Sequence, residues 1–308
     1  MALTGSGQIS LGDIAGEFGG SAPHALSEYH DTGNAPASGE IQLAADFYGT
    51  SNLFSYTISS NASQVNLRSN AIAAGWNGSS ALAVTINSGV TIYSGSTGSY
   101  AMVIDGAYAG GVTLTNNGTI LGKGGDGAQG AASGNTGCYG FASFSTGTAG
   151  AGGPALQISS AVTIVNGSGR ISGGGGGGGG GAGYSASSSN CSYGFGAQGG
   201  GGGGGIGNGA AGAAGSSVAS AGSAGSLTGA GSGGSGGIWP SCNNGSMYAG
   251  NGGAGGSWAA SGSNGTCSGN PTCNTYCGSS NGAAGGAATS GASNVTWTST
   301  GTRNGTVG

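Results

Sequence analysis

Ionisable side chains, which most enzymes need for catalysis, are scarce in this sequence and gathered near one end. The 308 residues contain eight Asp and Glu, four Lys and Arg, and two His. No Asp, Glu, His or Lys follows Asp126, so the later part of the chain cannot supply the paired carboxylates of a glycosidase. A Ser-His-Asp triad would need His24 or His30, which are more simply explained as surface or locally hydrogen-bonded residues. We therefore predict a protein that is not an enzyme and that holds no cofactor.

The cysteines could bind zinc or form disulfides. The last three, Cys267-x5-Cys273-x3-Cys277, lack the close pairs of usual structural zinc sites, so we expect no metal and favour disulfides. Six cysteines allow fifteen pairings. We expect Cys138 to pair with Cys191, because the two flank the first glycine run. The disulfide candidates are Cys138, Cys191, Cys242, Cys267, Cys273 and Cys277.

Charge and hydropathy argue against two classes of partner. Four basic residues in the whole chain are too few for a nucleic-acid groove, and no stretch is long and apolar enough to cross a membrane. We expect no nucleic-acid partner and no membrane insertion. The glycine runs also lack the lysine of a phosphate-binding loop. The N-terminal sequence has neither the basic region nor the apolar core of a signal peptide.

Aromatic residues after residue 126 gather in short inserts between glycine-rich stretches. The inserts are otherwise rich in Ser, Asn, Thr and Gly, a mixture typical of antibody paratopes, in which the rings serve as anchors. The rings could instead pack the ends of a glycine bundle, but such a bundle has no side-chain core for all of them to share. The candidate binding residues are Tyr139, Phe141, Phe144, Tyr184, Tyr193, Phe195, Trp239, Tyr248, Trp258 and Tyr276.

Residues 1–52 form the first of three regions and hold six of the eight acids. In SLGDIAGEFGG, Ser10 can cap a helix that carries Leu11, Ile14 and Phe18 on one face and that ends at two glycines. We predict a short helix there, and further single turns at ALSEYH and LAADFYG. The region is too short to bury a large core, so we interpret it as a small adaptor.

Residues 53–125 form the second region, in which Val, Thr and Ile alternate with small polar residues, as in LAVTINSGVTIYSG. This pattern predicts short strands, in a small sandwich or in a few rungs of a solenoid. VTLTNNGTILGKGG at 112–125 is echoed at 162–174 and at 295–308. We expect these echoes to be strands that bracket a glycine-rich mass, although their period is too irregular for the common solenoid arrays.

Residues 126–308 form the third region, which contains the glycine runs 173–181 and 199–205. Such runs usually form flexible linkers, but here no conventional domain follows and compact inserts interrupt them. Glycine lets polyproline-II-like chains pack side by side with their N–H and C=O groups free to bond to neighbours. We therefore predict a mainly β and irregular fold: the adaptor, the short-strand region and a bundle of packed polyglycine-II helices with aromatic loops.

Two sets of motifs resemble phage tail proteins. ISLGDIAGEFGGSAPHALSEYH and PASGEIQLAADFYGTS, within residues 9–51, resemble an N-terminal segment of many tailed-phage tail proteins. NNGTILGKGGDGAQGAA, GRISGGGGGGGGGAG and VTWTSTGTRNGTVG resemble the glycine-rich tail-fibre adhesins of T-even-type phages. That resemblance implies a polyglycine-II sandwich whose variable tip loops bind a receptor in the host's outer membrane. The corresponding loops here are the inserts at 131–151, 183–198, 238–249 and 257–281.

This resemblance implies a tail-fibre or tail-tip adhesin of the virion. Residues 1–52 would attach to a tail or baseplate protein, and the aromatic residues would bind a bacterial surface receptor, either an outer-membrane protein or a glycan. The alternatives are a purely structural tail cap or spacer and, less favoured, an ice-binding protein similar to those of snow fleas. Fibre proteins are often trimers, but a glycine bundle can also close within one subunit. Assembly in the host cytoplasm and release by lysis would reconcile disulfides with the lack of a signal peptide.

Overall fold

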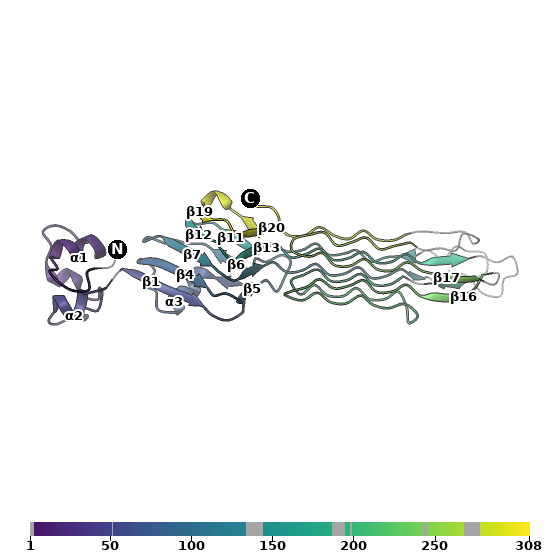
Figure 1. The fold of residues 1–308 in the computed structure, drawn as a ribbon, viewed down its shortest axis with the longest axis horizontal. Coiled ribbons are helices and arrows are strands. Elements are labelled where there is room, and N and C mark those ends of the chain that lie inside the picture. The colour runs from purple at the N-terminus through teal and green to yellow at the C-terminus, as the bar shows by residue number, and fades with distance from the viewer. Residues whose placement is uncertain are drawn as a thin grey trace.

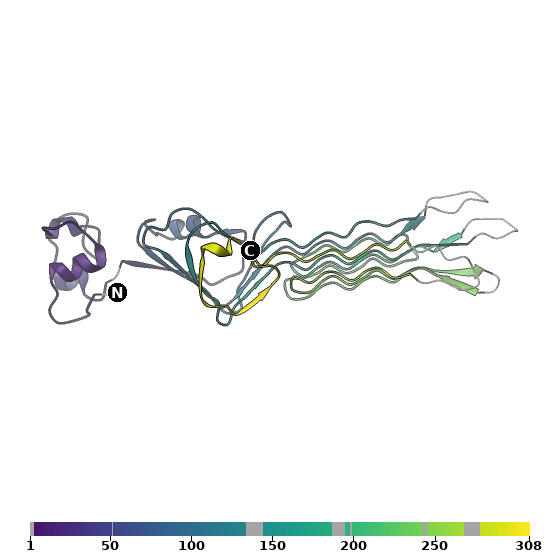
Figure 2. The same ribbon diagram turned by 90° about the horizontal axis from the view of Figure 1, so that it is seen from above.

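The protein is elongated and has three successive parts along its length (Figures 1 and 2). The computed structural model describes residues 3–50, 52–133, 144–186, 195–197, 199–242, 245–267 and 278–308. A helical N-terminal unit lies at one end, parallel sheets occupy the middle, and glycine-rich segments extend side by side to the other end. The two outer parts therefore lie on opposite sides of the sheets.

The N-terminal unit contains the short elements that its sequence predicts. Helix α1 (Leu11–Phe18) begins at Ser10, whose hydroxyl accepts a hydrogen bond from the Asp13 N–H, and it ends at Gly19. A 3-10 helix, η1 (Leu26–Tyr29), and α2 (Leu43–Phe47) follow, at the two predicted single turns. Ile14, Tyr29 and Phe47 form the buried centre of a small apolar cluster. The predicted helix and the two turns are confirmed.

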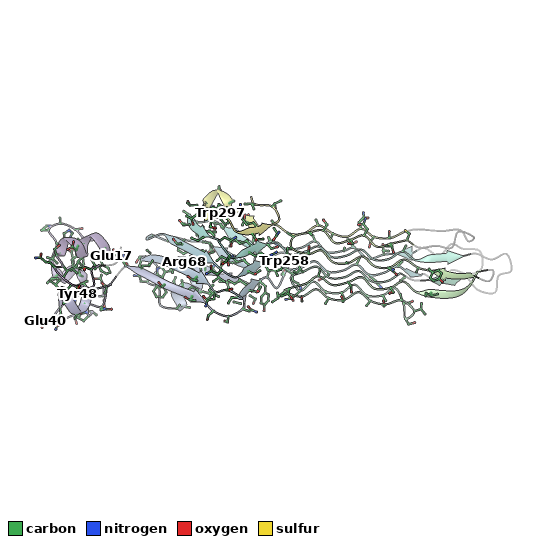
Figure 3. The ribbon with its side chains drawn as sticks, in the orientation of Figure 1. Glu17, Glu40, Tyr48, Arg68, Trp258 and Trp297 are labelled. Carbon is green, nitrogen blue, oxygen red and sulfur yellow. The ribbon has the colours of Figure 1, made fainter. Side chains whose placement is uncertain are left out.

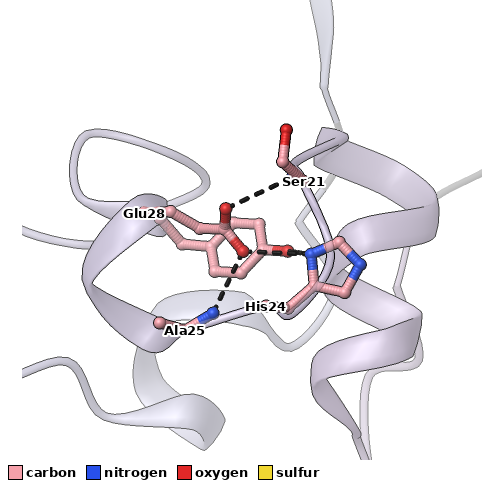
Figure 4. Close-up of polar contacts among 5 residues, drawn as sticks. Ser21, His24, Ala25 and Glu28 are labelled. Atoms are coloured by element: carbon pink, nitrogen blue, oxygen red, sulfur yellow. Dashed lines mark hydrogen bonds and ion pairs between the residues drawn. The ribbon is translucent and has the colours of Figure 1, made fainter.

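Glu28 fixes the chain just before η1 (Figure 4). Its Oε1 accepts a hydrogen bond from the Ala25 N–H at 3.1 Å and lies 3.0 Å from Nδ1 of His24, while Oε2 accepts from the Ser21 N–H at 3.4 Å. Burial raises the pKa of Glu28, but the hydrogen bonds from His24 and the backbone outweigh it, so the pKa lies below its usual value. The contact is therefore present at neutral pH and weakens as the pH falls through that lowered pKa.

Three all-parallel sheets form the middle of the molecule, and the chain visits them repeatedly in the same order. Each full circuit adds one strand to each sheet, which builds a three-sided coil that ends after the first two sheets of a fifth circuit. Helix α3 (Leu67–Ala73) follows the first circuit.

The first sheet contains β1 (Leu53–Ile58), β4 (Ala81–Ile86), β7 (Val112–Asn116), β12 (Val162–Val165) and β19 (Val295–Ser299). The second contains β2 (Ala62–Ser63), β5 (Thr91–Tyr93), β8 (Thr119–Leu121), β13 (Arg170–Ser172) and β20 (Thr302–Asn304). The third contains β3 (Val65–Asn66), β6 (Met102–Ile104), β11 (Leu156–Ile158) and β18 (Thr289–Ser290).

The interior of the coil is filled by alternate residues of its strands. In β4 every second side chain is buried, and Val84 stacks in register on Leu114 of β7, which stacks on Ile164 of β12. Where the chain turns from the first sheet to the second, the buried amide of Asn116 donates to Oδ1 of Asn166 at 2.8 Å. The three echoing sequences are thus successive layers of the same two sheets, and the prediction that they are strands is confirmed.

The predicted fold class is wrong. The framework is three parallel sheets of five, five and four strands, with three α-helices among the described residues, so the fold is sheet-dominated and is not a bundle of polyglycine helices. The echoes did not reveal the coil because insertions of increasing length separate its layers. The connection from the second sheet to the third is Gln64 in the first circuit and residues 94–101 in the next. It then grows to residues 122–155, and finally to residues 173–288.

These last two insertions form what we call the glycine array. Its described residues make extended segments, assigned to neither helix nor strand for most of their length, that run alternately away from and back toward the sheets. Backbone hydrogen bonds join each segment to its neighbours. The segments are 122–131, 147–155, 173–182, 199–206, 209–215, 220–226, 229–237, 249–256, 260–266 and 280–288.

The two pure glycine runs are the central segments of the array and are buried throughout. Hydrogen bonding has a period of three: the N–H groups of Gly175, Gly178 and Gly181 all donate to segment 199–206, and the intervening N–H groups donate to other segments. Run 173–181 thereby bonds to six segments, one of which contains the second run. The segments other than these two lie around the pair of runs. The six are 122–131, 147–155, 199–206, 249–256, 260–266 and 280–288.

The segments around the two runs differ in glycine content according to how many of the runs they bond to. Segments 122–131 and 249–256 bond to both runs and have glycine at half or more of their positions. Segment 260–266 bonds to one run and has glycine only at every third position, Gly262 and Gly265. Within the runs every position is crowded, since a Cβ at Gly177 would lie 1.9 Å from the carbonyl oxygen of Asp126. The runs are therefore the most tightly packed part of the array.

Replacing Gly177 by alanine should destabilise the protein by about 3 kcal/mol or more, because neighbouring backbone must move to admit the methyl group. The matched control is Gly229→Ala, also in the array, where the nearest atom to a new Cβ is Oγ of Ser226 at 3.8 Å. Thermal unfolding of the two variants and the parent measures the difference. Equal melting temperatures for Gly177→Ala and Gly229→Ala would contradict close packing of the run.

Candidate functional site

The alternating direction of the segments sorts their connections onto two ends of the glycine array. Residues 207–208, 227–228 and 257–259 turn at the end beside the sheets. The opposite end, which we call the tip, is the part of the molecule farthest from the N-terminal unit (Figures 1 and 2). The connections of the tip are 132–146, 183–198, 216–219, 238–248 and 267–279.

Three antiparallel hairpins start the longer connections of the tip. They pair β9 (Ala132–Ser133) with β10 (Phe144–Ser145), β14 (Tyr184–Ala186) with β15 (Phe195–Ala197), and β16 (Ile238–Cys242) with β17 (Gly245–Tyr248). Strand β15 lies against β16, so two of the hairpins are neighbours. Sequence patterns did not predict these hairpins, because their strands are short and lack the alternation of apolar and polar residues.

The hairpin strands carry five of the ten candidate binding residues to the same end of the molecule. These are Phe144, Tyr184, Phe195, Trp239 and Tyr248. Tyr139, Phe141, Tyr193 and Tyr276 lie outside the described residues. Three of the four predicted inserts contain these hairpins, whereas the fourth, 257–281, includes the sheet-end turn 257–259 and the array segment 260–266. The binding role of these residues stays a prediction.

An exposed apolar pair stands on the β16–β17 hairpin. Tyr248 is 49% exposed and lies opposite Ile238, which is 56% exposed, in the register of the two strands. Directly opposed residues of this kind have their side chains close together. Sequence reasoning missed Ile238, although its place directly before Trp239 was an available signal. Together the two side chains give the tip an exposed apolar surface, and burying such a surface against a partner is favourable.

Trp258 lies apart from the other candidates, at the sheet end of the array (Figure 3). The guanidinium carbon of Arg170, in β13, lies 4.2 Å from the centre of the indole ring, in the geometry of a cation–π contact. Arg170 also donates from Nη1 to Oδ1 of Asn304 at 3.3 Å. The N–H of the next residue, Ala259, donates to the carbonyl of Gly173 at 3.1 Å. Trp258 therefore fastens a turn of the array to the second sheet.

No three His, Cys, Asp or Glu side chains come together within the described part of the chain. None of the helices in that part has the length and apolarity to span a membrane.

The pairing of the cysteines stays a prediction. Cys138, Cys191, Cys273 and Cys277 lie outside the described residues, and only the backbone of Cys242 is described. Cys267 is described and exposed, at the start of a tip connection, and its Sγ lies 3.8 Å from Oγ of Ser279. The contact brings the two ends of the connection 267–279 together.

Comparison with known proteins identifies the part of the chain that begins with β1. The sequence profile of the family described as phage tail fibre adhesin Gp38 matches residues 53–308. The chain belongs to this family. Membership confirms the resemblance of the glycine-rich motifs to phage tail-fibre adhesins and makes the protein a component of a phage tail. The match leaves out the N-terminal unit.

A solved structure shares the fold of this adhesin. It is the crystal structure of the gp37-gp38 adhesin tip complex of the bacteriophage S16 long tail fiber, with a TM-score of 0.50 and 22% sequence identity. The similarity covers 98% of this chain and 99% of that chain. Among curated proteins, no match is found.

Replacing Trp258 by alanine should lower the free energy of unfolding by about 2 kcal/mol, because it removes the cation–π contact and part of the packing of the turn. Arg170→Ala and the double variant complete a double-mutant cycle, measured by chemical denaturation. Coupling between the two positions is expected. Strictly additive effects would contradict the proposed fastening of the array to the sheet.

Proposed function

We propose that the tip of this adhesin binds a receptor on the bacterial surface, an outer-membrane protein or a glycan. The observation that carries the proposal is the gathering of hairpins with aromatic and apolar residues at one end of an otherwise polar, glycine-packed array. Loops on a rigid scaffold are the usual place for binding residues. Exposed rings of Tyr and Trp supply contact area with few rotatable bonds.

The packing of the array favours such a role physically. Its central runs are hydrogen-bonded to neighbours on all sides, so the roots of the hairpins are fixed before a receptor arrives. Binding then avoids the entropic cost of ordering the scaffold. Recognition in this proposal is non-covalent, with no catalytic step and no cofactor.

Attachment to the virion is assigned in this proposal to residues 1–52, through a tail or baseplate protein. The unit lies at the end opposite the tip and has its own buried cluster. Its last residue before β1 is held to α1, because the Asn52 N–H donates to Oε1 of Glu17 at 3.0 Å. The similar solved structure is a complex of gp37 with gp38, which supports a fibre protein as the partner. One copy or three could be mounted on it, and assembly in the host cytoplasm would precede release by lysis.

Changing the exposed pair of the β16–β17 hairpin tests the binding role. Tyr248→Ala combined with Ile238→Ser should weaken binding of the protein to host cells at least about tenfold, since buried apolar anchors commonly contribute 2 kcal/mol or more. Binding of labelled protein to cells gives the affinity, and thermal unfolding checks the fold. The matched control is Ile72→Ser on α3, an apolar residue 43% exposed and remote from the tip.

A second measurement separates this proposal from a purely structural cap or spacer. Purified protein added before the phage should occupy receptors and reduce phage adsorption. If the protein does not compete, and if a variant with the hairpin 238–248 replaced by a short turn supports normal adsorption, the receptor-binding proposal is wrong. A cap would give that combination of results.

A further inference from the structure

The tip contains no charged residue. From residue 127 to the C-terminus the only Asp, Glu, Lys or Arg residues are Arg170 and Arg303, so every tip connection is formed of uncharged residues. Both arginines belong to the second sheet, in β13 and β20. They stack on Trp258 and Trp297, at 4.2 Å and 4.6 Å from the ring centres (Figure 3).

The two remaining charged residues of the array, Lys123 and Asp126, both lie on segment 122–131 and are also hydrogen-bonded. Lys123 donates from Nζ to the carbonyl of Asn208, in a turn at the sheet end. Oδ1 of Asp126 accepts a hydrogen bond from the Ala210 N–H at 2.8 Å. Ala132, where β9 begins, follows Asp126 by six positions, and an extended chain of that length spans on the order of 20 Å. This exceeds the Debye length of about 8 Å at physiological salt.

We propose that the tip recognises an uncharged region of its receptor, one that presents apolar and neutral hydrogen-bonding groups. The inference rests on the proposed receptor-binding function and narrows its ligand class. A phosphate or carboxylate buried against the tip would lose its hydration without gaining a side chain of opposite charge, which is unfavourable. The exposed Ile238 and Tyr248 instead match an apolar or neutral surface. The proposal therefore disfavours sugar phosphates and acidic polysaccharides as the primary ligand.

The same distribution of charge sets the dependence of binding on salt. Without charges at the tip there is no electrostatic steering, so association should proceed at the ordinary rate of about 10⁵–10⁶ M⁻¹s⁻¹. Screening by salt has no favourable charge pair to weaken. The binding constant should therefore be nearly independent of ionic strength, unlike that of an adhesin for anionic glycans.

A salt titration tests the inference on the full-length protein. Binding to outer-membrane vesicles from a host strain is measured from about 0.02 to about 0.5 M NaCl. The dissociation constant should change by no more than about twofold over this range. A tenfold or larger weakening, at a melting temperature that stays constant, would overturn the neutral-surface assignment.

Opposite charges at one tip position give a second, independent test. Tyr248→Lys and Tyr248→Glu should weaken binding to the vesicles by similar factors, with Tyr248→Gln as the neutral control. If the lysine variant binds at least about tenfold more tightly or more weakly than the glutamate variant, the receptor surface is charged and the inference is wrong. Failure of the receptor-binding proposal gives another result. In that case the double variant Tyr248→Ala with Ile238→Ser would bind the vesicles as tightly as the parent protein does.

Discussion

Close approach of backbone to backbone is the constraint on which the rest of this structure depends. In the two central runs each segment is surrounded on all sides, and a Cβ would lie about as close to a neighbouring carbonyl as the 1.9 Å found at Gly177. Only glycine satisfies that spacing, and it loses more backbone entropy on folding than any other residue. Hydrogen bonds in a period of three offset that cost by satisfying the buried N–H and C=O groups. The glycine-rich composition is thus a packing requirement of the interior, not a sign of disorder.

The array begins and ends in the three-sided coil of sheets, at the corner between the second sheet and the third. The first two circuits close the corner between the second and third sheets with Gln64 and with residues 94–101. The next two open that same corner and insert the array, after which β11 and β18 rejoin the third sheet in register. The array therefore grows from a framework with a conventional apolar core. Two of the four basic residues hold it there, Arg170 against Trp258 and Lys123 on the carbonyl of Asn208.

The sequence predicted local features of this protein better than its architecture. The helix that begins at Ser10 and the strands of the three echoes followed from capping and alternation, because those signals lie within about ten residues. The parallel sheets did not, because the pairing of β12 with β19 joins segments separated by the whole second insertion. Half of the candidate binding residues fall on described tip hairpins. Trp258 does not fall on a tip hairpin, because it lies in a turn at the sheet end of the array. The position of that turn follows from the alternating direction of the segments, which the sequence does not show.

Native-state hydrogen exchange of the glycine amides is the most direct test of the central claim, that a rigid, buried glycine array supports the tip. Amides of Gly173–Gly181 and Gly199–Gly205 donate to neighbouring segments almost without interruption, so they should exchange only through large-scale opening, as slowly as the amides of β7 and β12. Exchange of the runs at rates close to those of an unstructured peptide, with the sheets still protected, would contradict the claim.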